Sequence, residues 1–175
     1  PIDGYVGYSS LKVNCGVDGV NDPIALYIGD SGEKTTFSNG VAAHAASRVV
    51  YNIAGMNAEK FTAWAGTNRD RGECGYYVYT DLDEENALFS VQDLKGTDKA
   101  VAVDVAIPAE ATQLILVTDN GTDADTNSDH SVWADAKLTL KVEEEPVTPE
   151  QESDPSVVEY LSDWEFIDSH SDYQY

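Results

Sequence analysis

The chain has 175 residues, 42% of them hydrophobic, which suits one domain with a buried core. Its 10 Lys and Arg stand against 32 Asp and Glu, so the formal net charge is −22 and the field of the protein repels phosphate backbones and anionic lipid surfaces. No apolar run approaches the roughly 20 residues of a membrane span. We therefore expect no nucleic-acid or membrane partner, and the acidic, Tyr-rich composition favours a secreted or cell-surface location.

Short strands separated by turns follow one another along most of the chain. A helical period is sustained nowhere, apart from a single turn near residues 42–46. Turns such as Asp119-Asn120-Gly121 separate the strands. The pattern predicts an all-β protein, a jelly-roll β-sandwich with almost no helix. Period-two alternation and turn residues place its strands at residues 11–13, 24–28, 48–53, 61–65, 75–80, 87–91, 100–107, 113–118 and 136–142.

The composition changes after this series of strands. Residues 1–145 form the predicted sandwich, and residues 146–157 read as an acidic, proline-containing linker that cannot bury enough surface to offset its ordering entropy. Residues 158–175 then recover aromatic and β-branched side chains, which predicts a strand. We expect this tail to complete a sandwich, in cis or in a neighbouring molecule, with four side chains packed on the core: Val158, Tyr160, Trp164 and Phe166.

Two of the three tryptophans lie on predicted strands. Phe61, Ala63 and Ala65 alternate inward, so Trp64 faces outward, either as a platform for the C–H face of a sugar or beneath a covering loop. Trp133 also has outward parity, because the alternation places four other side chains of its strand on the opposite face. It either binds a ligand or packs beneath the loop before it. The four inward side chains are Ala134, Ala136, Leu138 and Leu140.

A polar loop follows the strand of Trp64 directly. It contains Asn68, Arg69 and Arg71, and arginine presents a planar fork that suits vicinal hydroxyls or a carboxylate. The alternative is charge compensation on a very acidic surface. We therefore take Asn68, Arg69 and Arg71 as candidate glycan contacts.

A second loop, residues 119–130, is rich in carboxylates. Asp119, Asp123, Asp125 and Asp129 offer the hard oxygen ligands that Ca²⁺ prefers, although the glycine and glutamate of an EF-hand are missing. The loop predicts either an irregular structural calcium site or a solvated acidic surface. No constellation typical of an enzyme accompanies it.

The two cysteines are too few for a disulfide scaffold. Cys15 and Cys74 either form one bridge or remain separate buried thiols, and the sequence leaves both alternatives open.

Four blocks in order carry a family resemblance. Residues 40–53 (GVAAHAASRVVYNI), 61–66 (FTAWAG), 113–121 (QLILVTDNG) and 129–138 (DHSVWADAKL) together resemble the NPCBM modules, the family 51 carbohydrate-binding modules of secreted bacterial glycoside hydrolases and surface proteins. The resemblance implies a non-catalytic β-sandwich that binds glycans, typically galactose-containing ones, often with a structural calcium ion.

The same resemblance singles out two histidines. His44 lies in the HA-x-S motif of the family, where the imidazole either bonds a backbone carbonyl or reaches the ligand. His130, which precedes the last long strand, has the same two interpretations.

The tail resembles the opening of such a module, because YLSDW (residues 160–164) stands at the end of this chain while GYVGYSS (residues 4–10) opens it. A tandem array cut within a module, an engineered permutation and a natural one all account for this order. The alternative to glycan binding is thus a structural or adhesive repeat of a cell-surface array, in which neighbouring modules exchange strands.

Overall fold

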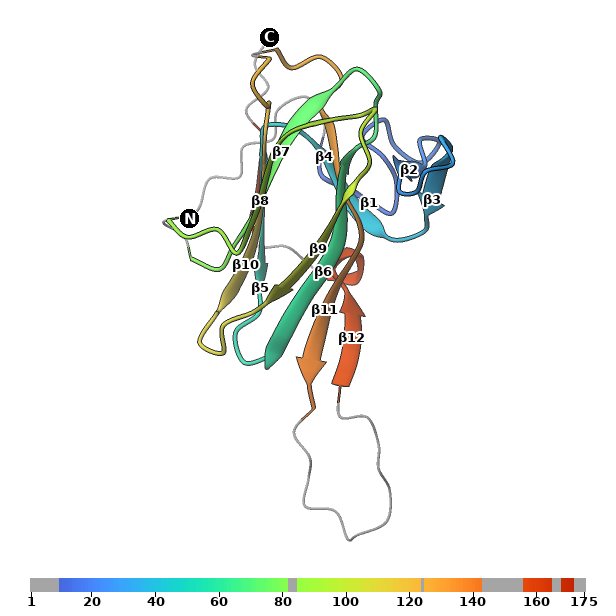
Figure 1. Cartoon of the computed structure of the whole chain (residues 1–175). Helices are drawn as coiled ribbons and strands as arrows, with labels where there is room; N and C mark the ends of the chain where they lie inside the picture. The colour runs from blue at the N-terminus through green and yellow to red at the C-terminus, as the bar shows by residue number, and fades with distance from the viewer. Residues whose placement is uncertain (1–9, 82–84, 124, 143–155, 165–167, 172–175) are drawn as a thin grey trace, which may run out of the picture.

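The computed structural model describes residues 10–81, 85–123, 125–142, 156–164 and 168–171. Two antiparallel sheets face each other as a β-sandwich, and a small two-stranded sheet lies beside them (Figure 1). The predicted all-β fold is confirmed. The described residues contain one helical element, the 3₁₀ turn η1 (Leu161–Asp163), and no helix that is long and apolar enough to cross a membrane.

The first sheet has the order β1-β4-β11-β6-β9, with β12 also paired to β11; the second has the order β13-β5-β10-β7-β8; β2 and β3 form the third. The strands are β1 (Lys12–Val13), β2 (Ile24–Tyr27), β3 (Lys34–Phe37), β4 (Gly40–His44), β5 (Ser47–Asn52), β6 (Ala58–Thr67), β7 (Glu73–Tyr79), β8 (Phe89–Lys95), β9 (Val101–Ala106), β10 (Gln113–Asp119), β11 (His130–Lys141), β12 (Ser156–Tyr160) and β13 (Asp168–Ser171).

The sequence reasoning missed β3 and β4, and the helical turn expected near residues 42–46 is wrong. β4 lies between β1 and β11 and is buried along its whole length. Val41 faces the space between the two large sheets, whereas Ala42 faces the β2–β3 hairpin. A strand buried on both faces shows no polar alternation, which is why its pattern could not be read.

Two hydrophobic clusters hold these layers together. The main core lies between the two large sheets and includes Tyr51, Phe61, Tyr76 and Leu116. The side core lies between the first sheet and the β2–β3 hairpin, around Ile24 and other buried aliphatic side chains. The first sheet is therefore covered on both faces where the hairpin lies.

A β-bulge in β11 changes which side chains face the main core. Asp135 has a φ of 52°, and the register with β6 shifts between Ala134 and Lys137. Trp133 and Ala136 therefore both face the main core, whereas Ala134 belongs to the side core. The expected inward direction holds for Ala136 and the residues after it and is wrong for Ala134, because a bulge interrupts the period-two rule.

The tail folds onto its own domain. β12 pairs with residues 137–141 of β11, on the edge whose other half is taken by β4, and β13 pairs with β5 in the second sheet. The tail thus passes from one sheet to the other (Figure 1). This arrangement is the first of the two alternatives, completion in cis. The adhesive-repeat alternative, which depends on strand exchange, stays a prediction.

The side chain that anchors the tail differs from those expected. Leu161 is 1% exposed within the main core, whereas Val158 is 55% exposed, so its expected burial is wrong. Trp164 packs at the edge of the main core as expected, and Tyr160 is partly buried beneath the ammonium group of Lys137. Phe166 and most of the 146–157 linker lie outside the described residues.

Candidate functional site

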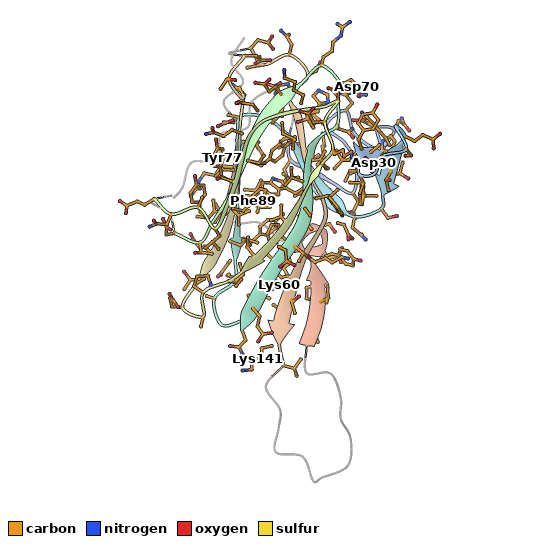
Figure 2. The ribbon with its side chains drawn as sticks, viewed as in Figure 1. Asp30, Lys60, Asp70, Tyr77, Phe89 and Lys141 are labelled. Atoms are coloured by element: carbon orange, nitrogen blue, oxygen red, sulfur yellow. The ribbon has the colours of Figure 1, made fainter. Side chains whose placement is uncertain are left out.

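An open hollow lies at the end of the sandwich where β6 turns into β7. This loop-end recess has a volume of about 290 Å³. Asp70 marks this end of the molecule in Figure 2, and Lys60 and Lys141 mark the opposite end. The loop between β6 and β7, strand β3 and the loop before β11 supply its walls. They contribute Lys34, Asn68, Arg69, Asp70, Arg71 and Ser128.

The side chain of Asn68 forms hydrogen bonds at the base of the recess. Its Oδ1 accepts a hydrogen bond from the backbone N–H of Ala25 at 2.8 Å, and its Nδ2 donates to the Pro23 carbonyl at 3.2 Å and to Asp22 Oδ1 at 3.4 Å. The Asn68 side chain is buried, and the protein already uses both ends of its amide. Its role in the structure is therefore to join the hairpin strand β2 to the end of β6.

Arg69 covers this network from outside. Its guanidinium contacts the Asp18 carboxylate directly and lies 3.2 Å from Asp22 Oδ1. The hydrogen bond from Arg69 holds the pKa of Asp18 below its usual range. Together with His130, these carboxylates form the only group of three potential metal ligands found within 4.8 Å of one another among the described residues. Arg69 already balances their charge, so we interpret the group as an ion-pair network.

The side chains of His44 and His130 lie next to each other. Their rings lie 5.5 Å apart in an edge-to-face arrangement, and both side chains are buried. His44 Nδ1 lies 2.7 Å from the Ala45 carbonyl oxygen, which is the structural alternative considered for this residue. Burial lowers the pKa of His130, and its Nδ1 lies 4.0 Å from Asp18 Oδ2. His130 thus lies beside the Asp18 carboxylate that pairs with Arg69.

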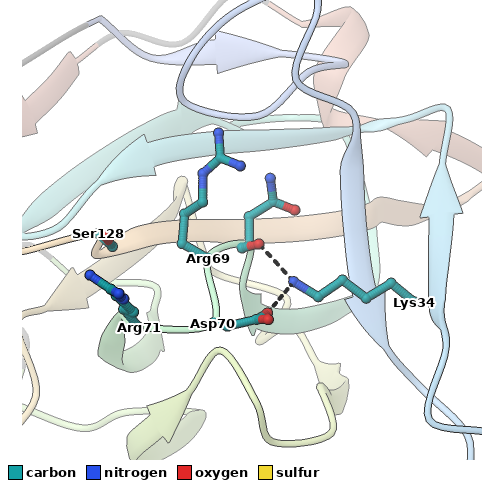
Figure 3. A pocket seen from close by; sticks show the side chains of 6 residues that line it. Lys34, Arg69, Asp70, Arg71 and Ser128 are labelled. Carbon is teal, nitrogen blue, oxygen red and sulfur yellow. Dashed lines mark hydrogen bonds and ion pairs between the residues drawn. The ribbon is translucent and has the colours of Figure 1, made fainter.

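Lys34 and Asp70 form the exposed wall of the recess (Figure 3). Lys34 Nζ donates to the Asn68 carbonyl at 2.9 Å and lies 2.7 Å from Asp70 Oδ1. The same ammonium group lies 5.0 Å from the centre of the Tyr27 ring. These contacts hold a cation and a carboxylate in fixed relative positions, an arrangement suited to a ligand rich in hydroxyl groups.

The two candidate tryptophans lie away from this recess. Trp64 packs against the side core, beneath the β2–β3 hairpin, which is the covered alternative. Trp133 is 3% exposed and contacts Phe61 and Tyr76 in the main core, so its expected outward direction is wrong. The bulge at Asp135 is the physical reason.

Cys15 and Cys74 are separate thiols in the structure, as the second alternative states, but only Cys74 is buried and Cys15 is partly exposed. Cys74 is buried in the main core, and this burial raises the pKa of its thiol far above the usual range.

The acidic loop divides into carboxylates with different roles. Asp119 accepts hydrogen bonds from the N–H groups of Gly75 and Gly121, at 2.9 and 3.0 Å, and from the Tyr77 hydroxyl at 2.8 Å. These donors account for both of its oxygens, so Asp119 fixes the turn and the end of β7. The exposed Asp123 and Asp125 each accept from a backbone N–H two residues further on.

Asp129 is the carboxylate of this loop that fits a cation. Its Oδ1 accepts from the Glu73 N–H at 3.1 Å, and the residue is 0% exposed, whereas its Oδ2 has no hydrogen-bond partner. The pKa of Asp129 is raised to about 7, chiefly by burial. The negative charges of Asp123, Asp125 and Glu73 contribute to the same rise. A buried, unpartnered oxygen surrounded by like charges is an environment that a calcium ion would relieve.

Three of the predicted glycan contacts, Asn68, Arg69 and Arg71, line the recess, and their contact with a glycan stays a prediction. The sequence analysis did not name four residues that line the recess or contact its lining, Asp18, Asp22, Lys34 and Ser128. No motif distinguishes these four from the many other polar residues of the chain. Lys34 lies in the unpredicted strand β3, and the two aspartates lie in the segment between β1 and β2. The packing of the β2–β3 hairpin on the first sheet brings Lys34 to the β6–β7 loop, and the pairing of β11 with β6 brings Ser128 there.

Comparison with known proteins gives two consistent results. A family model described as NPCBM/NEW2 domain matches residues 5–139. The structure is similar to that of CBM51 from Clostridium perfringens GH95 in complex with methyl-galactose, with 28% identity, a TM-score of 0.68, and coverage of 78% of this chain and 92% of that chain. Comparison with curated proteins gave no match.

Two further solved structures share the fold. The structure of CBM51-2 in complex with GlcNAc and INT domains from Clostridium perfringens ZmpB is 25% identical, with a TM-score of 0.67, and the match covers 78% of this chain and 29% of that one. The tandem CBM51 modules of Sp3GH98, a family 98 glycoside hydrolase from Streptococcus pneumoniae SP3-BS71, are 21% identical, with a TM-score of 0.63 and coverage of 77% and 43%.

Proposed function

Since this chain belongs to the NPCBM/NEW2 domain family, we propose that it is a carbohydrate-binding module that recognises galactose-containing glycans through the loop-end recess. The similar structures contain CBM51 modules, one in complex with methyl-galactose and one in complex with GlcNAc. The observation that carries the proposal is the fixed Lys34–Asp70 pair on the open wall of the recess.

The chemistry of this pair suits a sugar. Adjacent hydroxyls of a pyranose each donate and accept, so they pair best with a cation and a carboxylate held side by side. Galactose differs from glucose in the direction of one hydroxyl, and fixed polar partners can therefore tell the two apart. Lys34 and Asp70 are held in this way by the Asn68 carbonyl and by each other.

Asp70→Asn is expected to weaken binding of methyl-galactose by about tenfold or more, because a hydrogen bond to a charged group contributes about 1.5–3 kcal/mol. Isothermal titration calorimetry measures the change. The matched control is Asp104→Asn, because Asp104 also pairs with a lysine, Lys60, on an exposed strand. Its side chain is 65% exposed against 57% for Asp70, so the two substitutions remove the same charge from similar surroundings.

Equal loss of affinity in the two variants would mean that overall charge, and not the recess, governs binding. Unchanged affinity in Asp70→Asn would place the sugar elsewhere on the molecule. An absence of binding to galactosides and to GlcNAc by the unaltered protein would reject the glycan-binding function altogether.

We also propose that the module acts outside the cell, as an accessory to a secreted or surface-bound bacterial protein. Support comes from the net charge of −22 and from the 28% identical module, which is CBM51 from Clostridium perfringens GH95. Detection of the native protein in the culture medium or on intact cells, by a specific antibody, tests the location. Signal confined to the lysed-cell fraction would contradict it.

Calcium is proposed as a structural ion of the acidic loop. Asp129 Oδ2 would hold it together with the carboxylates of Asp123 and Asp125, and the ion would neutralise the buried charge. These three groups do not form a preassembled cluster in the structure, so binding would draw the loop together. Asp119, whose oxygens serve protein donors, is left out of this set.

We expect calcium to raise the melting temperature and EDTA to reverse the effect, since a ligand at a hundredfold excess over Kd adds about 2.7 kcal/mol. Asp129→Asn should abolish the calcium response. In EDTA the contribution of the Asp129 carboxyl is full below its ordinary pKa and is lost as the pH rises through about 7. The variant, which cannot ionise, should therefore be more stable than the unaltered protein at pH 8 in EDTA.

Asp104→Asn again serves as the control, because that exposed carboxylate should affect neither the calcium response nor the pH profile. A calcium-induced rise that persists in Asp129→Asn would place the ion at another site. An unchanged melting temperature of the unaltered protein with calcium and with EDTA would contradict the proposed calcium site.

A further inference from the structure

The loop-end recess concentrates positive charge on a strongly negative protein. Three of its six lining residues are cations, Lys34, Arg69 and Arg71, and Asp70 is the one carboxylate among them. The whole chain has only 10 Lys and Arg and a net charge of −22. Three cations around one hollow are therefore an unusual local concentration of positive side chains on this protein, which needs a reason beyond solubility.

We propose that the recess binds the anionic group of an acidic glycan, a carboxylate or a sulfate carried on a galactose-like sugar. The inference rests on the proposed function and names the class of glycan that the same site selects. A carboxylate and a sulfate present the same chemistry, a group of oxygens that share negative charge and accept parallel hydrogen bonds.

The ion-pair partners of the three cations identify Arg71 as the anion receptor. Arg69 is balanced by Asp18 and Asp22, and Lys34 by Asp70. The exposed Arg71 has no ion-pair partner among the described residues. Its guanidinium lies on the Ser128 side of the recess, away from the Lys34–Asp70 pair (Figure 3). An anion at this position would meet an uncompensated fork and a hydroxyl group that can donate.

Arg71 borders two hollows that differ in the charge of their lining residues. The smaller hollow, of about 210 Å³, is lined by Glu73 and Asp123 as well as by Lys95. Lys95 Nζ lies 3.8 Å from Glu73 Oε2, so that hollow offers no net attraction to an anion. Among the lining residues, cations outnumber carboxylates in the recess and carboxylates outnumber cations in the smaller hollow. The recess is also the side that holds the proposed sugar contacts.

The net charge of the protein does not cancel this preference. Charges on the exposed surface are screened over about 8 Å at physiological ionic strength, whereas a guanidinium in hydrogen-bond contact with a carboxylate is screened far less. The local pair therefore outweighs distant repulsion once the ligand is bound. Measurements belong at about 0.15 M salt, because low salt would enhance the repulsion between the acidic protein and an acidic ligand.

The test compares three ligands that share the galactose configuration: methyl-galactose, methyl-galacturonic acid and a galactose sulfate. Calorimetric titration should give association constants for at least one acidic ligand about fivefold or more above that of methyl-galactose. The pattern separates the two sources of charge, because a carboxylate-selective recess prefers the uronic acid and a sulfate-selective one the sulfated sugar. Binding of both acidic ligands equally would still support the shared anionic chemistry.

Three substitutions test the receptor. Arg71→Gln should bring the ratio of acidic to neutral affinity to about one, and Arg71→Lys should keep part of it, because charge remains while the fork is lost. The matched control is Lys141→Gln, which removes one exposed cation at the opposite end of the sandwich (Figure 2) and should leave the ratio unchanged. Superimposable circular dichroism spectra would confirm that each variant is folded.

The outcomes distinguish this inference from the function on which it rests. If methyl-galactose binds and the acidic ligands bind equally or more weakly, the glycan function stands and the anionic subsite is wrong. If the acidic preference survives in Arg71→Gln, the anion binds elsewhere and the assignment to this recess is wrong. If none of the three sugars binds, both proposals fail together.

Discussion

Removal of residues 143–175 is expected to lower the free energy of unfolding by about 5 kcal/mol or more, a large share of the 5–15 kcal/mol typical of a domain. The truncation takes β12 from one half of an edge of β11 and β13 from β5. It also empties the site of Leu161, which is 1% exposed, and loss of one buried leucine alone costs about 2–5 kcal/mol. Urea denaturation followed by tryptophan fluorescence measures the difference.

Two single substitutions test whether the buried side chains of the tail account for its contribution to stability. Leu161→Ala should reproduce a substantial part of the loss, whereas Val158→Thr should be nearly neutral, because Val158 is 55% exposed on the same segment. Sedimentation of the truncated chain should reveal self-association through the unpaired edges of β11 and β5. Equal unfolding free energies for the full and truncated chains would show that the tail contributes nothing to the fold.

Trp133→Ala is expected to destabilise the protein by about 3–5 kcal/mol, the usual cost of emptying a large aromatic site in a core. The ring of Trp133 lies 5.4 Å from that of Tyr76 and 6.2 Å from that of Phe61, so its loss opens a cavity between the two sheets. Trp64→Ala is the matched comparison. Trp64 is only partly buried against the side core, and its removal should cost clearly less.

Thermal and urea unfolding of the two tryptophan variants rank these effects. Trp133→Phe should recover part of the stability, because the smaller ring still fills some of the volume. A larger loss for Trp64→Ala than for Trp133→Ala would contradict the assignment of Trp133 to the main core. That result would support the outward direction of Trp133 that unbroken alternation along β11 predicts.

The sequence by itself determined most of the strands and the family. Alternation predicted the inward direction of Phe61, Ala63 and Ala65, and these side chains do lie in the main core. The turn at residues 119–121 is likewise explained locally, because Asp119 accepts a hydrogen bond from the Gly121 N–H. Such features depend on neighbours a few positions apart, so pattern and turn chemistry are sufficient to find them.

Only the tertiary structure decided which residues meet at the recess and which way Trp133 points. Asp18, Lys34 and Arg69 come from separate segments, and the packing of the β2–β3 hairpin on the first sheet unites them. The bulge at Asp135 reverses the faces of β11, and it is seen in the backbone of Asp135 and in the register with β6. The tail folds in cis because β11 extends beyond β4 and offers residues 137–141 for pairing. Contacts between distant segments leave no periodic trace in the chain, which is why a pattern of neighbouring residues could not reveal them.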